Sequence, residues 1–235
     1  MPVVDVTHLV PAHDVRAGAL TLWRAAPWLV PGVILGVVDP GVGTARRAVA
    51  VEVAEAGAVL VGPDNGLLLP AAHALGRITA AVELDAARSR RAGRGVTFAG
   101  RDLFAPVSAR IALGADLAGF GRPLDPAGLA GDPVPAPQRE PTGRVCCEVL
   151  WIDRFGNVQL NAGPADVEHL GAVVALGAGA TTCQARLAGA FAELDPQQVG
   201  LVTDSYGLLA VSLNGASAAA LLGIRPGDRI FLDPP

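Results

Sequence analysis

Apolar runs and helical segments alternate through the first half of the chain. Mainly apolar runs at residues 33–38, 48–53 and 59–61 predict buried strands, and segments with helical character at residues 20–29, 67–75 and 103–113 predict helices. Alternating strands and helices are typical of an α/β domain with a largely parallel sheet. We therefore expect such a domain over residues 1–121.

The second half has a different pattern, in which short apolar segments are separated by Gly, Pro and Asn. The predicted strands are residues 145–152, 158–160, 173–176, 184–187, 200–202, 208–213 and 229–232. One short helix, 216–222, is expected to end at Gly223. Short strands at even spacing predict an all-β, barrel-like domain over residues 144–235. Six prolines between residues 122 and 143 predict an extended linker between the two domains.

The composition narrows the range of partners. Apolar residues make up 51% of the chain and charged residues 17%, which is enough to fill a hydrophobic core. The net charge is −4 and no basic block is present, so neither nucleic acid nor an anionic membrane is an expected partner. All 18 basic residues are arginines, which excludes a Schiff-base lysine and a P-loop lysine.

The three cysteines, Cys146, Cys147 and Cys183, have no metal-binding spacing. We therefore expect no zinc site. Their odd number and the adjacent pair fit a reduced, cytoplasmic setting. No apolar run approaches the length of a membrane span, and the N-terminus lacks the basic-then-apolar pattern of a secretion signal.

One candidate catalytic group stands at the end of a predicted strand. The apolar run 33–38 is followed by Asp39 and then by Pro-Gly-Val-Gly, a turn that neither a strand nor a helix interior tolerates. Ligands of α/β folds bind at the carboxyl ends of strands, which is where Asp39 is expected. Arg46 is close enough across a folded-back turn to pair with this carboxylate. The alternative is an Asp that caps a turn, with Arg46 on the surface.

Further segments follow in a fixed order. They are Val-Asp-Val-Thr-His at 4–8, Asp-Val-Arg-Ala-Gly at 14–18, Gly-Pro-Asp-Asn-Gly at 62–66, Thr-Phe-Ala-Gly-Arg-Asp-Leu-Phe-Ala-Pro at 97–106, Ile-Asp-Arg-Phe-Gly-Asn at 152–157 and Asn-Gly-Ala-Ser at 214–217. With the Asp39 motif, they resemble the S-adenosylmethionine hydroxide adenosyltransferases. These are adenosine-forming hydrolases related to the fluorinating and chlorinating enzymes. The resemblance implies homotrimers with active sites between neighbouring subunits, and a small-molecule substrate without a further cofactor.

The resemblance assigns the chemistry to Asp39 and Arg46. Displacement at the ribose 5′ carbon of a sulfonium releases a neutral leaving group, so it needs a positioned nucleophile and no general acid. Asp39 matches the family's water-activating Asp, and Arg46 matches the Arg of the same cluster. A carboxylate repels halide, so Asp39 favours water as the nucleophile. The family's third group is a His, and here that position is Ala99. We expect Ala99 to leave space for water, and Ala99→His to accelerate the reaction.

The resemblance also assigns substrate contacts in the second half. Asp153 would take the substrate's ammonium, Phe155 would pack on the adenine, and Asn157 would hydrogen-bond the polar edge of the base. Each residue type suits its task, as an anion, a π surface and an amide. The alternative is a structural turn made by Asp153, with Phe155 in the core.

Other matches are less specific. Ser205 corresponds to a contact with the methionine carboxylate, and Asn214 and Gly215 to contacts with the adenine, although Asn-Gly alone is also a turn before a helix. His13 would stand against the ribose or replace the missing His; the alternative is a surface or capping His. Arg101 and Asp102 match the motif around Ala99, with an ion pair as the alternative. The tight-turn sequence Asp-Asn-Gly at 64–66 is interpreted as structural.

Three functions remain open at this point. The first is hydrolysis of S-adenosylmethionine to adenosine and methionine, and the second is a halogenating relative, which Asp39 disfavours. The third is a nucleoside-binding protein with little turnover. Ala99 favours the third. The N-terminus also favours it if the protein lacks the strand and Asp-Phe-Gly turn with which the family opens, upstream of what is here residue 3; the alternative is a misassigned or trimmed start, which would restore the catalytic interpretation.

Overall fold

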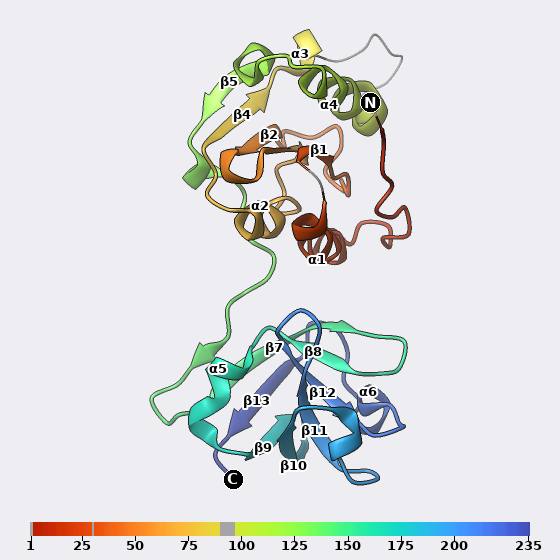
Figure 1. Cartoon of the computed structure of the whole chain (residues 1–235), viewed down its shortest axis with the longest axis vertical. Coiled ribbons are helices and arrows are strands. Elements are labelled where there is room, and N and C mark those ends of the chain that lie inside the picture. The colour runs from red at the N-terminus through yellow and green to blue at the C-terminus, as the bar shows by residue number, and fades with distance from the viewer. Residues whose placement is uncertain (1, 30, 90–96) are drawn as a thin grey trace. The chain divides into compact units, whose positions relative to one another are not determined.

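The computed structural model describes residues 2–29, 31–89 and 97–235. The chain divides into two compact units, Met1–Pro133 and Val134–Pro235 (Figure 1). The boundary between the units lies inside the proline-rich stretch 122–143, so one part of that stretch belongs to the first unit and the other part to the second. Residues 121–124 form a strand of the first unit, and residues 138–139 form a strand of the second.

The first unit is a sheet with helices on both faces. Its strands are β1 (Gly32–Leu35), β2 (Ala48–Val53), β3 (Ala58–Pro63), β4 (Ala80–Leu84) and β5 (Gly121–Leu124), in the order β1-β3-β2-β4-β5. Its α-helices are α1 (Val15–Ala25), α2 (Leu69–Leu75), α3 (Ala86–Ser89) and α4 (Ala105–Ala112). A π-helical turn, η3 (Gly100–Phe104), leads into α4, and short 3₁₀ turns connect the other elements.

Alternate strand residues face two separate cores. Val49 and Val51 of β2 pack in one core with residues of α1 and α2, whereas Ala48 and Ala50 pack in the other with Leu103, Phe104 and Val107 of η3 and α4. Figure 1 shows α1 and α2 on one side of this sheet and α4 on the other. The period of two along β2 thus explains how both faces are covered.

The expectation of a largely parallel sheet is wrong, because the sheet is mixed. Within the described part of this sheet only β1 and β3 pair in parallel, and the β2–β3, β2–β4 and β4–β5 pairs are antiparallel. The reason is the connection after β2, which consists of one 3₁₀ turn, Ala54–Ala56, and Gly57 in a left-handed conformation at φ +59°. Such a connection makes a hairpin, whereas parallel neighbours need a crossover of roughly a dozen residues.

Two predicted elements of this unit have different bounds in the structure. Helix α1 begins five residues before the predicted segment, because the Asp14 side chain accepts a hydrogen bond from the Ala17 amide at 2.8 Å and so caps the helix. Strand β1 ends at Leu35, three residues before the predicted end. Asp39 therefore follows a short extended segment and does not directly follow the ladder.

The second unit is a closed barrel, as the spacing of short strands predicted. Its strands are β6 (Gln138–Arg139), β7 (Val145–Ile152), β8 (Val158–Leu160), β9 (Val173–Ala178), β10 (Thr181–Ala188), β11 (Val199–Thr203), β12 (Leu209–Leu213) and β13 (Arg229–Asp233). The ring runs β13-β9-β10-β11-β12-β8-β7 and closes by pairing of β13 with β7, while β6 adds to β7. Helices α5 (Pro164–Val167) and α6 (Ala218–Leu222) lie between strands.

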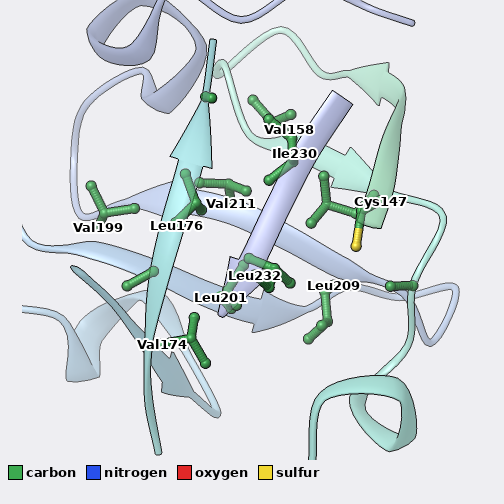
Figure 2. Close-up of a cluster of buried hydrophobic side chains, with 14 of the residues drawn as sticks. Cys147, Val158, Val174, Leu176, Val199, Leu201, Leu209, Val211, Ile230 and Leu232 are labelled. Atoms are coloured by element: carbon green, nitrogen blue, oxygen red, sulfur yellow. The ribbon is translucent and has the colours of Figure 1, made fainter. Parts of the chain in front are cut away.

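The barrel interior is filled by aliphatic side chains from all around the ring. Figure 2 shows Val174 and Leu176 of β9 with Leu201 of β11, Val211 of β12 and Ile230 of β13 in one cluster. Inward residues alternate with more exposed ones along β9, as its burial pattern shows. The barrel is therefore a packed core, and its candidate site residues lie in the turns at its ends. Among the described helices of the chain, none is long and apolar enough to cross a membrane.

Candidate active site

The segment leading to Asp39 is held between several elements of the first unit. The Asn65 side-chain amide donates to the Val38 carbonyl at 2.9 Å. Gly18 of α1 packs directly against Val38, because a Cβ atom at position 18 would lie only 2.8 Å from Val38 Cγ2. Gly100 at the start of η3 faces Val37. Asp39 thus emerges where α1, η3 and the turn at 63–67 meet.

The turn after Asp39 brings the chain back on itself. The Val42 amide donates to the Asp39 carbonyl at 3.3 Å, and the Thr44 hydroxyl donates to the Gly41 carbonyl at 2.7 Å. Gly43 has φ +81°, a conformation that favours glycine. The Pro-Gly-Val-Gly sequence therefore forms the folded-back turn predicted for it, and it returns the chain toward β2.

Asp39 and Arg46 form a bidentate ion pair. Arg46 Nε donates to Asp39 Oδ1 at 2.8 Å and Arg46 Nη2 donates to Asp39 Oδ2. The Asp39 side chain is 6% exposed and the Arg46 side chain is 15% exposed, so the pair is shielded but still accessible to solvent. The guanidinium also lies over the Phe104 ring, 5.2 Å from its centroid. This pairing was expected from the sequence, whereas the aromatic platform of Phe104 was not.

The Asp39 carboxylate retains capacity for a further ligand. A carboxylate offers about four acceptor positions, and among the described residues the side chain of Asp39 accepts only the two hydrogen bonds from Arg46. Bidentate arginine also fixes the plane of the carboxylate. The arrangement can orient one water molecule and accept a proton from it.

The residues of the motif that contains Ala99 mainly contact the core and one another. Ala99 is 2% exposed and belongs to the apolar core with Leu103 and Phe104, so it does not line a polar cavity. Arg101 and Asp102 pair with each other at 2.7 and 2.9 Å, as the ion-pair alternative predicted. The exposed Arg101 guanidinium lies over Phe98, and its pairing with Asp102 raises the pKa of Arg101.

Asp153 organises the turn between β7 and β8. Its Oδ1 accepts hydrogen bonds from the amides of Phe155 and Asn157 at 2.8 and 2.9 Å, and its Oδ2 accepts one from Asn157 Nδ2 at 2.8 Å. This is the structural turn that the sequence left as an alternative. Phe155 is 64% exposed, however, so it is not the core residue of that alternative.

The Asp153 turn lies against the segment that follows β12. Gly156 has no room for a side chain because Ser217 occupies that space, and the Gly156 carbonyl accepts from the Ala219 amide at 3.0 Å. Asn214 and Gly215 stand just before this contact, and Asn214 donates to the Leu194 carbonyl at 3.1 Å. The structure therefore gathers the turn at 153–157 and the residues at 214–217 at one end of the barrel.

Ser205 and His13 occupy other places. Ser205 is exposed in the turn between β11 and β12, whereas Asn214 follows β12, so the two lie at opposite ends of that strand. Val158 of β8 pairs with Val211 of β12, which puts Asp153 near the Asn214 end. His13 is exposed, has φ +68° and directly precedes the capping residue Asp14 of α1.

Among the described residues, neither a reactive cysteine nor a metal-binding cluster contributes to the candidate site. Cys146, Cys147 and Cys183 are free thiols, and burial raises the pKa of Cys147 to about 12, which keeps it protonated. Within residues 2–29, 31–89 and 97–235, no group of three or more His, Cys, Asp or Glu side chains could hold a metal ion.

Two solved structures share the fold of this chain. An uncharacterized conserved protein from Thermotoga maritima matches it with a TM-score of 0.85 and 31% identity, over 99% of this chain and 89% of the other. A conserved hypothetical protein from Thermus thermophilus matches with a TM-score of 0.74 and 35% identity, over 97% of this chain and 86% of the other.

Sequence comparison then gives the family. Residues 1–121 match the SAM hydroxide adenosyltransferase N-terminal domain, and residues 147–231 match the C-terminal domain of the same family. A protein of Salinispora tropica named (R)-S-adenosyl-L-methionine hydrolase is 49% identical over 97% of this chain and 85% of its own length. A protein of the same name from Thermus thermophilus is 39% identical over 98% and 87%. The chain belongs to the SAM hydroxide adenosyltransferase family.

Proposed function

We propose that this protein hydrolyses S-adenosyl-L-methionine to adenosine and L-methionine. The observation that carries the proposal is the shielded Asp39–Arg46 pair, whose carboxylate keeps acceptor positions free for water. The names of the relatives specify the R compound, and we propose the same configuration for the substrate here.

The reaction is a single in-line displacement. The water oxygen attacks the ribose 5′ carbon, the bond between that carbon and sulfur breaks, and its electron pair stays on sulfur. Methionine leaves as a neutral thioether, so no group has to protonate it. Asp39 accepts the proton of the water and later releases it to solvent. Arg46 holds the carboxylate in a fixed plane.

The proposed substrate contacts lie mainly in the barrel. Phe155, Asn157, Asn214 and Gly215 bind the adenine, and the exposure of the Phe155 ring supports its role as a stacking surface. Asp153 takes the ammonium through its remaining acceptor position at Oδ2. His13 stands against the ribose.

Ser205 is the contact for the methionine carboxylate that the family resemblance implies. The amine and carboxylate of methionine share one carbon atom, whereas Asp153 and Ser205 lie toward opposite ends of the paired strands β8 and β12. One barrel therefore cannot offer both groups to the same methionine, so we propose that Ser205 comes from a different subunit than Asp153. We further propose that a homotrimer completes the site, with the acid–arginine pair and the adenine contacts supplied by neighbouring subunits, as the family resemblance implies. The three free thiols favour a cytoplasmic setting for it.

The test is an assay of product formation by the purified protein. The two sulfonium epimers of S-adenosylmethionine are incubated separately, with and without chloride, and adenosine, methionine and 5′-chloro-5′-deoxyadenosine are quantified by chromatography. We expect equal amounts of adenosine and methionine from the R epimer, independent of chloride. A chlorinated nucleoside would favour the halogenating alternative, and saturable binding without product would favour the binding protein.

A further inference from the structure

The turn at residues 63–67 is bonded to both ends of the Asp39 loop. Asn65 Nδ2 donates to the Val38 carbonyl at 2.9 Å, and Asn65 Oδ1 accepts from the Leu67 amide at 3.2 Å. One side chain thus connects its own turn to the residue directly before Asp39, 27 positions earlier.

Asp64 makes the corresponding connection at the other end. Its Oδ2 accepts from Arg47 Nε at 2.7 Å, and its Oδ1 accepts from the Ala130 amide at 2.7 Å. The Asp64 amide donates to the Arg47 carbonyl at 2.9 Å, and Arg46 Nη1 donates to the same carbonyl at 3.3 Å. The carbonyl that orients the Arg46 guanidinium is therefore itself fixed by Asp64.

These contacts are more than an isolated tight turn requires. In a simple turn, Asp and Asn side chains bond to backbone groups a few residues away. Here the carboxylate of Asp64 and the amide of Asn65 are both directed to the segment that contains Asp39 and Arg46. Asp64 and Arg47 are largely shielded, with 5% and 32% of their side chains exposed.

We propose that Asn65 is a positioning residue for the reaction, acting through Asp39. The inference deepens the proposed function and rests on it for its kinetic part. Asn65 holds the carbonyl of Val38, directly before Asp39, and thereby fixes the position from which the Asp39 side chain extends. A displacement of about 1 Å in such a group costs roughly 10²-fold in rate.

The test substitutes the donor and retains the acceptor. Asn65→Asp keeps an oxygen for the Leu67 amide but loses the donor to Val38. Asn161→Asp is the matched control, because Asn161 likewise donates to a backbone carbonyl, that of Pro135, and accepts from a backbone amide, that of Glu148, in the barrel core. We expect both variants to melt at lower temperature, and only Asn65→Asp to lose kcat, by about 10²-fold with KM little changed.

A double-mutant cycle separates positioning from general destabilisation. In an Asp39→Asn background, assayed with enzyme in excess, Asn65→Asp should cost less than about threefold, because the group it positions is already gone. An equal loss in both backgrounds, or unchanged kcat in the single variant, would overturn the proposal.

A measurement without substrate keeps this inference separate from the proposed function. The Arg46 Nε–H signal in ¹H–¹⁵N spectra is assigned by its absence in Arg46→Lys, and its exchange with water is measured. We expect exchange to be about tenfold faster in Asn65→Asp and unchanged in Asn161→Asp. If the wild type releases no adenosine, the proposed function fails, while this exchange rate still decides whether Asn65 positions the pair. Unchanged exchange would exclude that role.

Discussion

Two aspartate turns, one in each unit, hold their carboxylates in different ways. Asp39 is bound by the side chain of Arg46, seven residues along the chain, whereas Asp153 is bound by two backbone amides and one side chain of its own turn. Of about four acceptor positions per carboxylate, Asp39 uses two and Asp153 three among the described residues. Among the described residues, the Asp39 carboxylate thus keeps two acceptor positions for an additional ligand, whereas the Asp153 carboxylate mainly stabilises its own turn.

The difference shows what each turn can contribute to catalysis. The Asp39 turn positions a charged carboxylate. Among the described residues, the hydrogen bonds from Arg46 fix that carboxylate and leave part of its acceptor capacity unused. The Asp153 turn places its neighbours, because its bonds present Phe155 outward and set Asn157 beside the segment after β12. We infer that chemistry resides in the first unit and recognition of the base in the second.

Asp39→Asn gives the strongest test of this division. The amide keeps an oxygen for Arg46 Nε but cannot take a proton from water, so kcat should fall by roughly 10²–10⁴-fold. Binding of substrate should change little, because the adenine contacts that we propose are in the barrel. Steady-state kinetics and calorimetric titration measure the two quantities. Unchanged kcat would remove Asp39 from the mechanism.

Mixing two inactive variants tests whether the two turns act from different subunits. Asp39→Asn and Asn157→Ala are each expected to be nearly inactive alone. In randomly mixed trimers with composite sites, about one quarter of the sites would carry neither change, so activity should return to that fraction of the wild-type level. Subunit exchange is verified by native mass spectrometry of labelled chains. No recovery after exchange would place both turns of each site in one chain.

Substitutions at Asp153 separate its two roles. Asp153→Asn retains Oδ1 for both backbone amides, and a flip of the Asn157 amide restores the third bond. Loss of the charge should then raise KM by about tenfold if Asp153 binds the ammonium, since a charge-assisted hydrogen bond contributes roughly 1.5–3 kcal/mol. Asp153→Ala should additionally lower the free energy of unfolding, measured by urea denaturation. Wild-type KM in the Asn variant would leave Asp153 with its structural role alone.

The sequence predicted the barrel better than the sheet of the first unit. The predicted strands 145–152 and 158–160 coincide with β7 and β8, because short apolar runs between turn residues can be recognised in the sequence itself. Strand direction is not, so the mixed order of the first sheet was missed. Strand β5 was also missed, since Pro123 and Gly121 are poor strand formers that an edge position tolerates.

The candidate site shows the same limit. The Asp39–Arg46 pairing follows from a spacing of seven residues across a turn, which a sequence displays directly. The contacts from Asn65 to Val38 and from Arg46 to the Phe104 ring join segments far apart in the chain. No local pattern signals them, because they depend on how β1, β3 and η3 pack together.

Substitution of Ala99 has the smallest expected effect. It tests directly whether this chain can use the His that its family carries at this position. Ala99 shares an apolar cluster with Phe104, and the ring of Phe104 supports the guanidinium of Arg46. A larger side chain at position 99 must displace core atoms, so Ala99→His and the control Ala99→Leu should each lose about 1–3 kcal/mol of stability. Because Ala99 lies in this core, the imidazole can exchange a proton with the water proposed at Asp39 only if the core repacks around it; in that case Ala99→His, and not Ala99→Leu, should raise kcat. The gain should be about tenfold, below the usual contribution of a general acid–base group, because this core was not built around an imidazole. Chemical denaturation and kinetics on the folded variants measure both effects. A folded Ala99→His protein no faster than its parent would show that an imidazole at this position does not act with the Asp39–Arg46 pair.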